Sequence, residues 1–178
     1  MQLKKGSTRI VLLIPFLGIA VKLPIIRIGL IIKELKTFWV DKDLGCFVSF
    51  FYPFKVSDSG TFADLFFEGI FSNLIEFWTF FTLGSFALVP TYFTFFGLFN
   101  IQKMVISLNQ KHEKYLARIL FKVFGFYIYE DLYHFLETDN FTCSAEGRLQ
   151  MIDYGSKEVA RVLGRYGEEL GRMRLYFD

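Results

Sequence analysis

The chain has 178 residues, the length of a single domain with its own apolar core. Its 20 basic and 18 acidic residues nearly balance, which argues against a dedicated nucleic-acid-binding protein. The 24 phenylalanines and the 53% of hydrophobic residues leave three interpretations open: a thick core, an apolar face that docks on a protein partner, and association with a membrane.

The first apolar run, residues 10–21, follows three basic residues, a pattern typical of signal peptides. The same run also suits a pair of buried strands broken by Pro15 and Gly18. Apolar character resumes at residues 25–32, where a mature N-terminus normally turns polar, and this favours strands. We therefore expect short extended runs over residues 9–33. The three basic residues are Lys4, Lys5 and Arg9.

The next segment alternates between polar and apolar character. Residues 33–43 are polar and suit a short helix or a linker. Residues 47–54 are apolar and strand-like and end near Pro53, and turn-forming residues follow at 57–61. The first half of the chain is therefore expected to be rich in strands.

A helix is predicted from Phe62 onward. Thr61 suits an N-cap, with Asp64 three residues later as in a capping box, and Gly84 is a natural end. Helical spacing separates an apolar side, expected to be buried, from a polar side. The apolar side carries Leu65, Ile70, Leu74 and Phe77, and the polar side carries Asp64, Glu68, Ser72 and Glu76.

Residues 77–101 carry no formal charge and are long enough to span a bilayer. Two buried strands with a turn are the alternative, and the aromatic and β-branched residues after Pro90 favour strands. A small integral membrane protein with spans near residues 10–32 and 77–101 is thus the alternative to a globular domain.

The second half of the chain is more helical. Residues 109–123 carry an apolar stripe at helical spacing, and Gly125 is a natural stop. A turn is predicted at Glu146-Gly147, a strand over residues 148–152, and a helix from Ser156. A strand-rich first half followed by helices predicts an α+β fold.

One constellation suggests chemistry. In residues 139–156, DNFTCSAEGRLQMIDYGS, Asn140 precedes a turn and a short strand that ends at Asp153-Tyr154-Gly155. Carboxylate and amide oxygens are ligands that Mg²⁺ accepts in phosphoryl-transfer sites. The segment resembles the catalytic-loop Asn, hairpin and DFG segment of the protein-kinase-like superfamily, and Asn140 and Asp153 stand at the separation common in that family. The resemblance implies that both bind magnesium and that Gly155 permits the turn.

The resemblance extends more weakly to the first half. Lys22 in GIAVKLP resembles the strand lysine that contacts nucleotide phosphates, and Glu76 in NLIEFW resembles the helix glutamate that pairs with it. The implied cofactors are ATP and Mg²⁺, and the implied partner is a nucleotide. The implied fold is a trimmed, single kinase-like domain over residues 1–178, with an N-lobe-like part at 1–105 and a reduced C-lobe-like part at 106–178.

Several features depart from the family pattern. Phe135 stands where the catalytic Asp is expected, and only an insertion would make Asp131 the residue that orients the acceptor hydroxyl. No Gly-rich loop precedes Lys22, and Lys22 and Glu76 are unusually far apart in the sequence. These departures predict a minimal or degenerate member, either a phosphotransferase or a pseudokinase.

The two cysteines, Cys46 and Cys143, form no CxxC or Cys/His cluster. A reducing compartment is therefore expected, which means a cytoplasmic location, with a membrane location as the alternative.

Overall fold

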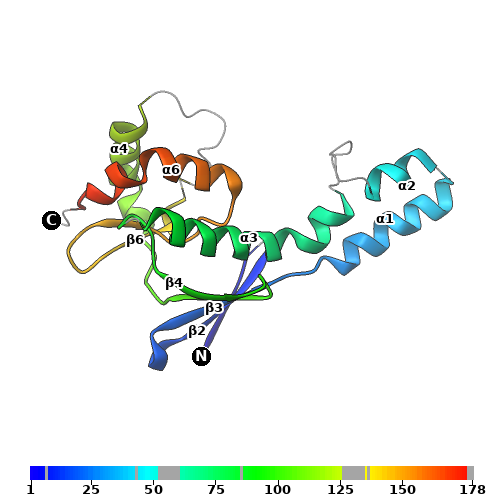
Figure 1. Cartoon of the computed structure of the whole chain (residues 1–178), viewed down its shortest axis with the longest axis horizontal. Helices are drawn as coiled ribbons and strands as arrows, with labels where there is room; N and C mark the ends of the chain where they lie inside the picture. Colours follow the sequence, from blue (N-terminus) through cyan, green and yellow to red (C-terminus); the bar gives the residue numbers. More distant parts are fainter. Residues whose placement is uncertain are drawn as a thin grey trace.

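The structure is a computed structural model and describes residues 1–6, 8–42, 44–51, 61–84, 86–125, 135 and 137–175. These residues form an antiparallel sheet from the first part of the chain, a long helix across one face of it, and a second group of helices with a small ladder from the C-terminal part (Figure 1). The predicted α+β class is confirmed.

The described sheet has five strands in the order β1-β2-β3-β5-β4, and every neighbouring pair is antiparallel. Aliphatic residues make up most of β2 and β3, and β4 consists of threonine and aromatic residues, as suits a pleated surface. The expected strand pair around residues 10–21 and the strands after Pro90 are confirmed. The strands are β1 (Gln2–Lys5), β2 (Arg9–Ile14), β3 (Ile19–Pro24), β4 (Thr91–Phe95) and β5 (Phe99–Lys103), with a short 3₁₀ turn η1 (Pro15–Leu17) between β2 and β3.

The long helix α3 (Phe62–Leu83) begins directly after Thr61 and ends before Gly84, as expected. Its predicted inner face is wrong. Leu74 is exposed, whereas Asn73 and Glu76 are completely buried against the sheet. The helix turns these polar residues inward because the facing surface of the sheet offers cations and amides instead of apolar side chains.

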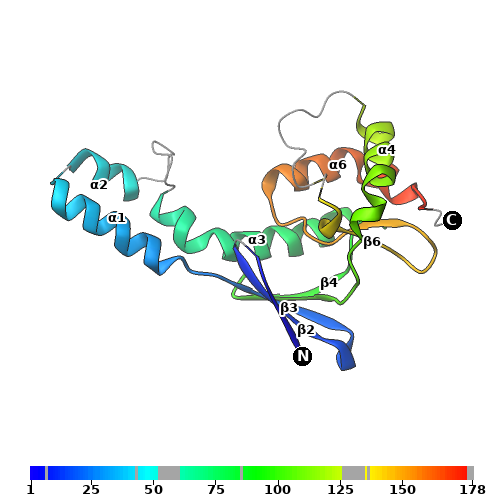
Figure 2. The same ribbon diagram turned by 180° about the vertical axis from the view of Figure 1, so that it is seen from behind.

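Two helices, α1 (Ile28–Asp41) and α2 (Leu44–Phe51), project with the start of α3 away from the sheet (Figures 1 and 2). We call α1 and α2 the helical arm. Extended structure at residues 28–33 and a strand at 47–51 were predicted, and both predictions are wrong. Short apolar runs do not fix a period by themselves, and here Ile31 and Phe50 pack with α3 instead of entering a sheet. The expected turn at 57–60 lies outside the described residues.

The C-terminal part agrees with the predicted helices, turn and strand. Gly125 ends α4, the turn lies at Glu146-Gly147, and the side-chain oxygen of Ser156 caps α6 by accepting a hydrogen bond from the Val159 N–H at 3.0 Å. The elements are η2 (Gln110–His112), α4 (Glu113–Phe124), η3 (Thr138–Asn140), β6 (Phe141–Cys143), β7 (Leu149–Met151) and α6 (Lys157–Arg172).

The main described core lies between α4, α6 and the β6–β7 ladder. Residues 87–89, which follow α3, pair with the end of β7. The Met151 N–H donates to the Ala87 carbonyl at 2.7 Å, and the Val89 N–H donates to the Met151 carbonyl at 3.0 Å. This pairing holds the end of β7 next to the segment that links α3 to the sheet. Asp153, two residues after β7, therefore lies beside the sheet.

The two segments considered as membrane spans are parts of this fold. Residues 10–32 form β2, β3 and the first turn of α1, and residues 77–101 form the end of α3 with β4 and most of β5. Throughout the part of the chain that the structure describes, the helices lack the combined length and apolar character needed to cross a bilayer.

Candidate functional site

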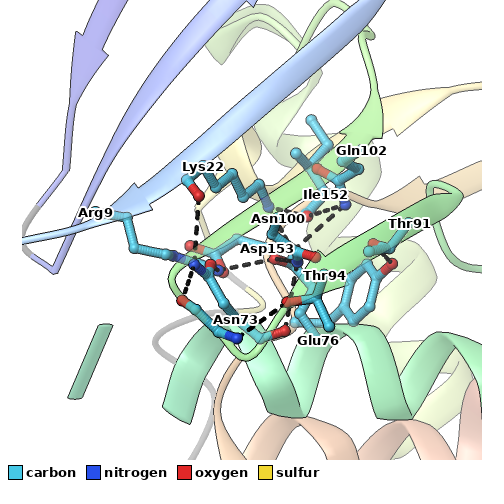
Figure 3. Close-up of polar contacts among 12 residues, drawn as sticks. Arg9, Lys22, Asn73, Glu76, Thr91, Thr94, Asn100, Gln102, Ile152 and Asp153 are labelled. Carbon is cyan, nitrogen blue, oxygen red and sulfur yellow. Dashed lines mark hydrogen bonds and ion pairs between the residues drawn. The ribbon is translucent and has the colours of Figure 1, made fainter. Parts of the chain in front are cut away.

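The centre of the candidate site is Glu76, whose side chain is completely buried on α3. It accepts hydrogen bonds from Arg9 Nη1 at 2.8 Å, Asn100 Nδ2 at 3.1 Å and Gln102 Nε2 at 3.3 Å, and it pairs with Lys22 Nζ (Figure 3). A buried carboxylate is tolerated only when its charge and its oxygens are matched. These four donors supply that match.

The sheet register brings the donors together. Lys22 on β3 lies opposite Asn100 on β5, and Ala20 lies opposite Gln102. Since alternate residues of a strand point to the same face, Lys22, Asn100 and Gln102 all face α3. One polar face of the sheet thus meets one polar face of the helix.

Lys22 is held from two sides. Its Nζ pairs with Glu76 and also donates to the carbonyl of Ile152 at 3.1 Å. Burial lowers the pKa of Lys22 by disfavouring the ammonium form, and the nearby Arg9 adds to this, while Glu76 opposes it. The two contacts hold the Lys22 nitrogen at the junction between the sheet and the residue before Asp153.

Asp153 follows β7 and keeps 44% of its side chain exposed. Its carboxylate is paired with Arg9 Nη2 and also accepts the backbone N–H of Gly155. Desolvation favours the neutral acid, but Arg9 and Lys22 outweigh it and hold the pKa of Asp153 below its usual range. This carboxylate is therefore ionised at neutral pH and partly accessible.

Arg9, at the start of β2, joins the two carboxylates. Besides its pairs with Glu76 and Asp153, its Nη1 lies 3.4 Å from Asn73 Oδ1 on α3. Burial opposes the charge of Arg9, but Asp153 and Glu76 outweigh burial and raise its pKa. Its guanidinium stays charged and links β2, α3 and the segment after β7 (Figure 3).

Asn140 ends η3 and lies beside the residue that precedes Asp153. Its carbonyl accepts the Ile152 N–H at 2.7 Å, so the two backbone segments are adjacent, as expected. Its side-chain Nδ2 lies 3.3 Å from Glu137 Oε2. The expected adjacency of Asn140 and Asp153 is present, and their binding of magnesium stays a prediction.

The remaining DYG residues anchor the segment. The hydroxyl of Tyr154, completely buried, donates to the Val89 carbonyl at 2.7 Å and lies 2.7 Å from Thr91 Oγ1. A Cβ added to Gly155 would lie 2.6 Å from the Ser72 carbonyl oxygen on α3. Gly155 is therefore required by a close backbone contact, whereas the sequence assigned it to a turn.

These side chains border a pocket of about 610 Å³, a volume that suits a small-molecule ligand. Its apolar lining includes Val11 and Leu13 of β2 with Ala20 of β3. The segment after β5 contributes Val105 and Ser107. The charged side is lined by Lys4, Lys5, Arg9, Lys22, Lys103, Glu137, Asp139, Asn140 and Asp153.

A second pocket, of about 800 Å³, lies between α3 and β4 on another side of the molecule. Aromatic and aliphatic side chains dominate it, and Lys157 is the ionisable residue among those that line it. The charged pocket is the candidate site because the nominated residues Lys22, Asn140 and Asp153 line it.

Comparisons of the chain with protein-family models, curated proteins and solved structures found no match. The function proposed for the charged pocket therefore rests on the chemistry of its own residues.

Four residues nominated from the sequence meet at this pocket: Lys22, Glu76, Asn140 and Asp153, with Glu76 directly behind the lining. The fifth, Asp131, lies outside the described residues. Phe135, at the position expected for a catalytic Asp, is completely buried in the core.

In this arrangement the Asp153 carboxylate is engaged by Arg9, so it does not fit a Mg²⁺ ion while that contact is made. The amide nitrogen of Asn140 lies near Glu137. Within the described residues, no group of three or more His, Cys, Asp and Glu side chains is gathered in a way that could hold a metal.

Sequence reasoning missed Arg9, Asn73, Asn100 and Gln102. Arg9 was grouped with the basic residues before the apolar run. A usable signal was present in the strand FNIQK, since Asn100 and Gln102 are two residues apart and alternate with Phe99 and Ile101. Polar side chains with that period predict a polar inward face and therefore a buried partner on the facing element.

Proposed function

We propose that this chain is a kinase-like nucleotide-binding protein and that ATP binds in the charged pocket. The observation that carries the proposal is the meeting of Lys22, Glu76, Asn140 and Asp153 at one pocket that also has an apolar side. In protein kinases the phosphate-contacting lysine lies on the third strand and pairs with a helix glutamate. Lys22 on β3 and Glu76 on α3 have the same relationship.

The pocket has room and chemistry for both ends of a nucleotide. The apolar residues Val11, Leu13 and Ala20 suit a base, and the basic residues that line the same pocket suit phosphates. The β1–β2 hairpin borders the pocket through Gly6 and Thr8, at the position where a phosphate-covering loop lies in kinases. It holds one glycine, in place of the Gly-rich sequence of that family.

We propose binding and leave phosphoryl transfer unassigned. Transfer needs a group that orients the acceptor hydroxyl. Phe135 has no such group, and Asp131 lies outside the described residues. A pseudokinase, acting through its nucleotide-bound form, therefore suits the site better than an efficient phosphotransferase.

ATP titration followed by calorimetry tests the proposal. Val11→Phe would fill the apolar side of the pocket, so we expect it to weaken ATP binding by about tenfold or more. The matched control is Leu12→Phe, the next residue of β2, which is not among the pocket residues. Wild-type protein that does not bind ATP, or equal effects of the two substitutions, would count against this function.

A further inference from the structure

The buried guanidinium of Arg9 contacts the carboxylate that the resemblance to kinases nominates as a metal ligand. Its Nη2 contacts Asp153, the nominated metal ligand, and its Nη1 lies 2.8 Å from Glu76. Only 7% of the Arg9 side chain is exposed. A positive charge is thus already fixed between the two carboxylates, and it is supplied by the chain itself.

A divalent cation would have to displace this guanidinium from Asp153. Arginine does not lose its proton in proteins, so the displaced group would remain as a buried charge beside Lys22 with one carboxylate fewer. Removing one partner from a buried charge pair is strongly unfavourable. Metal binding at Asp153 is therefore opposed by the loss of a contact that the folded chain already makes.

The surroundings of Arg9 favour an anion. Five basic residues line the pocket against three carboxylates: Lys4, Lys5, Arg9, Lys22 and Lys103 against Glu137, Asp139 and Asp153. Guanidinium and ammonium groups bind phosphate oxygens through charge-assisted hydrogen bonds. A guanidinium has five N–H donors, and the contacts that Arg9 makes with described residues involve Asn73, Glu76 and Asp153.

We propose that Arg9, with Lys22, replaces the divalent cation at this pocket, so that the chain binds nucleoside polyphosphates in their metal-free form. This inference rests on the proposed function, because it names the form of the nucleotide that the same pocket takes. Arg9 neutralises Asp153, which otherwise repels phosphate, and the lysines around it supply the attraction.

Calorimetric titration of the full chain with ATP, in excess EDTA and in excess Mg²⁺, tests the inference. We expect wild-type protein to bind ATP in EDTA at least as tightly as with Mg²⁺. Asp153→Asn removes a negative charge at a partly exposed side chain, so we expect it to keep or tighten binding in EDTA. A role of Asp153 as a metal ligand predicts the opposite, which is loss of Mg²⁺-supported binding in this variant.

Arg9→Gln provides the complementary variant. We expect it to weaken binding in EDTA by about tenfold or more, because a charge-assisted contact is lost. Mg²⁺ should restore part of that loss, since the Asp153 carboxylate is released. Arg27→Gln is the matched control, because Arg27 also pairs with a glutamate of α3 but is not among the pocket residues.

The outcomes separate the two proposals. Wild-type binding that appears only with Mg²⁺ overturns the inference and leaves the proposed function intact. No ATP binding in either buffer overturns both. If circular dichroism shows that Arg9→Gln does not fold, the comparison of wild type with Asp153→Asn decides, because the latter substitution keeps the shape of a side chain that is 44% exposed.

Discussion

Lys22 and Glu76 form an ion pair between β3 and α3, with 4% and 0% of their side chains exposed. The pair joins residues that are 54 positions apart in the sequence. Because both side chains are almost fully buried, each charge has lost its hydration and is stabilised mainly by the other.

Replacing Glu76 should therefore lower the free energy of unfolding strongly. Glu76→Gln leaves Arg9 and Lys22 without their shared counter-charge, and removing one partner of a buried pair typically costs about 3–5 kcal/mol. Urea denaturation followed by circular dichroism measures the loss. Glu68→Gln is the control on the same helix, because Glu68 is 46% exposed in its pair with Arg27 and should contribute about 1 kcal/mol or less. Equal losses in the two variants would contradict this account of the buried pair.

The stability of the chain should fall in acid partly through Asp153. Because Arg9 lowers the pKa of Asp153 in the folded chain, its stabilising effect is complete above the unfolded value of about 3.9 and is lost as pH falls below it. The free energy of unfolding of wild type and Asp153→Asn should therefore converge as pH decreases. Denaturation curves across acid pH measure this, and a difference that stays constant with pH would show that the charge of Asp153 is not involved.

Gly155→Ala should destabilise the fold by about 1–3 kcal/mol, because the added Cβ would lie 2.6 Å from the Ser72 carbonyl oxygen. Gly164→Ala is the comparison within α6, where an added Cβ would lie 4.0 Å from a methyl carbon of Leu83, an ordinary contact distance. That substitution should stabilise the helix by about 1 kcal/mol, through alanine's higher helix propensity. Thermal unfolding of both variants checks the opposite signs, and a Gly155→Ala variant as stable as wild type would mean that the contact with α3 relaxes easily.

The helical arm should behave as an interaction surface. Trp39 is 80% exposed on α1, whereas Ile31, on the same helix, is 8% exposed and packs with Phe50. Trp39→Lys should leave the unfolding temperature nearly unchanged and reduce binding of an apolar dye, since it removes exposed apolar surface. Ile31→Lys should lower the unfolding temperature by exposing the contact between α1 and α2. If Trp39→Lys lowers it equally, Trp39 is part of the packing.

The sequence was most informative where local rules decide the structure. Ser156 before an amphipathic run predicted α6, and the alternating residues 148–152 after the Glu146-Gly147 turn predicted β7. Both depend on neighbours within a few residues. The contact between Lys22 and Glu76 was reached differently, through the resemblance to a family, and the structure places the two side chains together. Their roles toward a nucleotide stay predictions.

Other features depend on contacts that the sequence does not display. Residues 47–51 look like part of a strand because phenylalanine and valine favour sheets, but their partners are helices, and they fold as part of α2. In the sequence, Glu76 looks like a solvent-facing helix residue, because its partners Arg9 and Lys22 lie on strands that are distant in the chain. Arg9 looked like part of a basic N-terminal segment. The sequence gives no sign of its partners, because they lie far along the chain, on α3 and after β7.

The close backbone contact at Gly155 has a counterpart elsewhere on α3, where a Cβ added to Gly69 would lie 2.5 Å from the Thr8 carbonyl oxygen. With main chain touching main chain near Arg9 and again near Asp153, α3 has little freedom to slide or rotate. The charged side chains of the pocket are therefore already in position before a ligand binds. Binding would require little further ordering of the protein, so affinity would be gained through preorganisation rather than through an induced rearrangement.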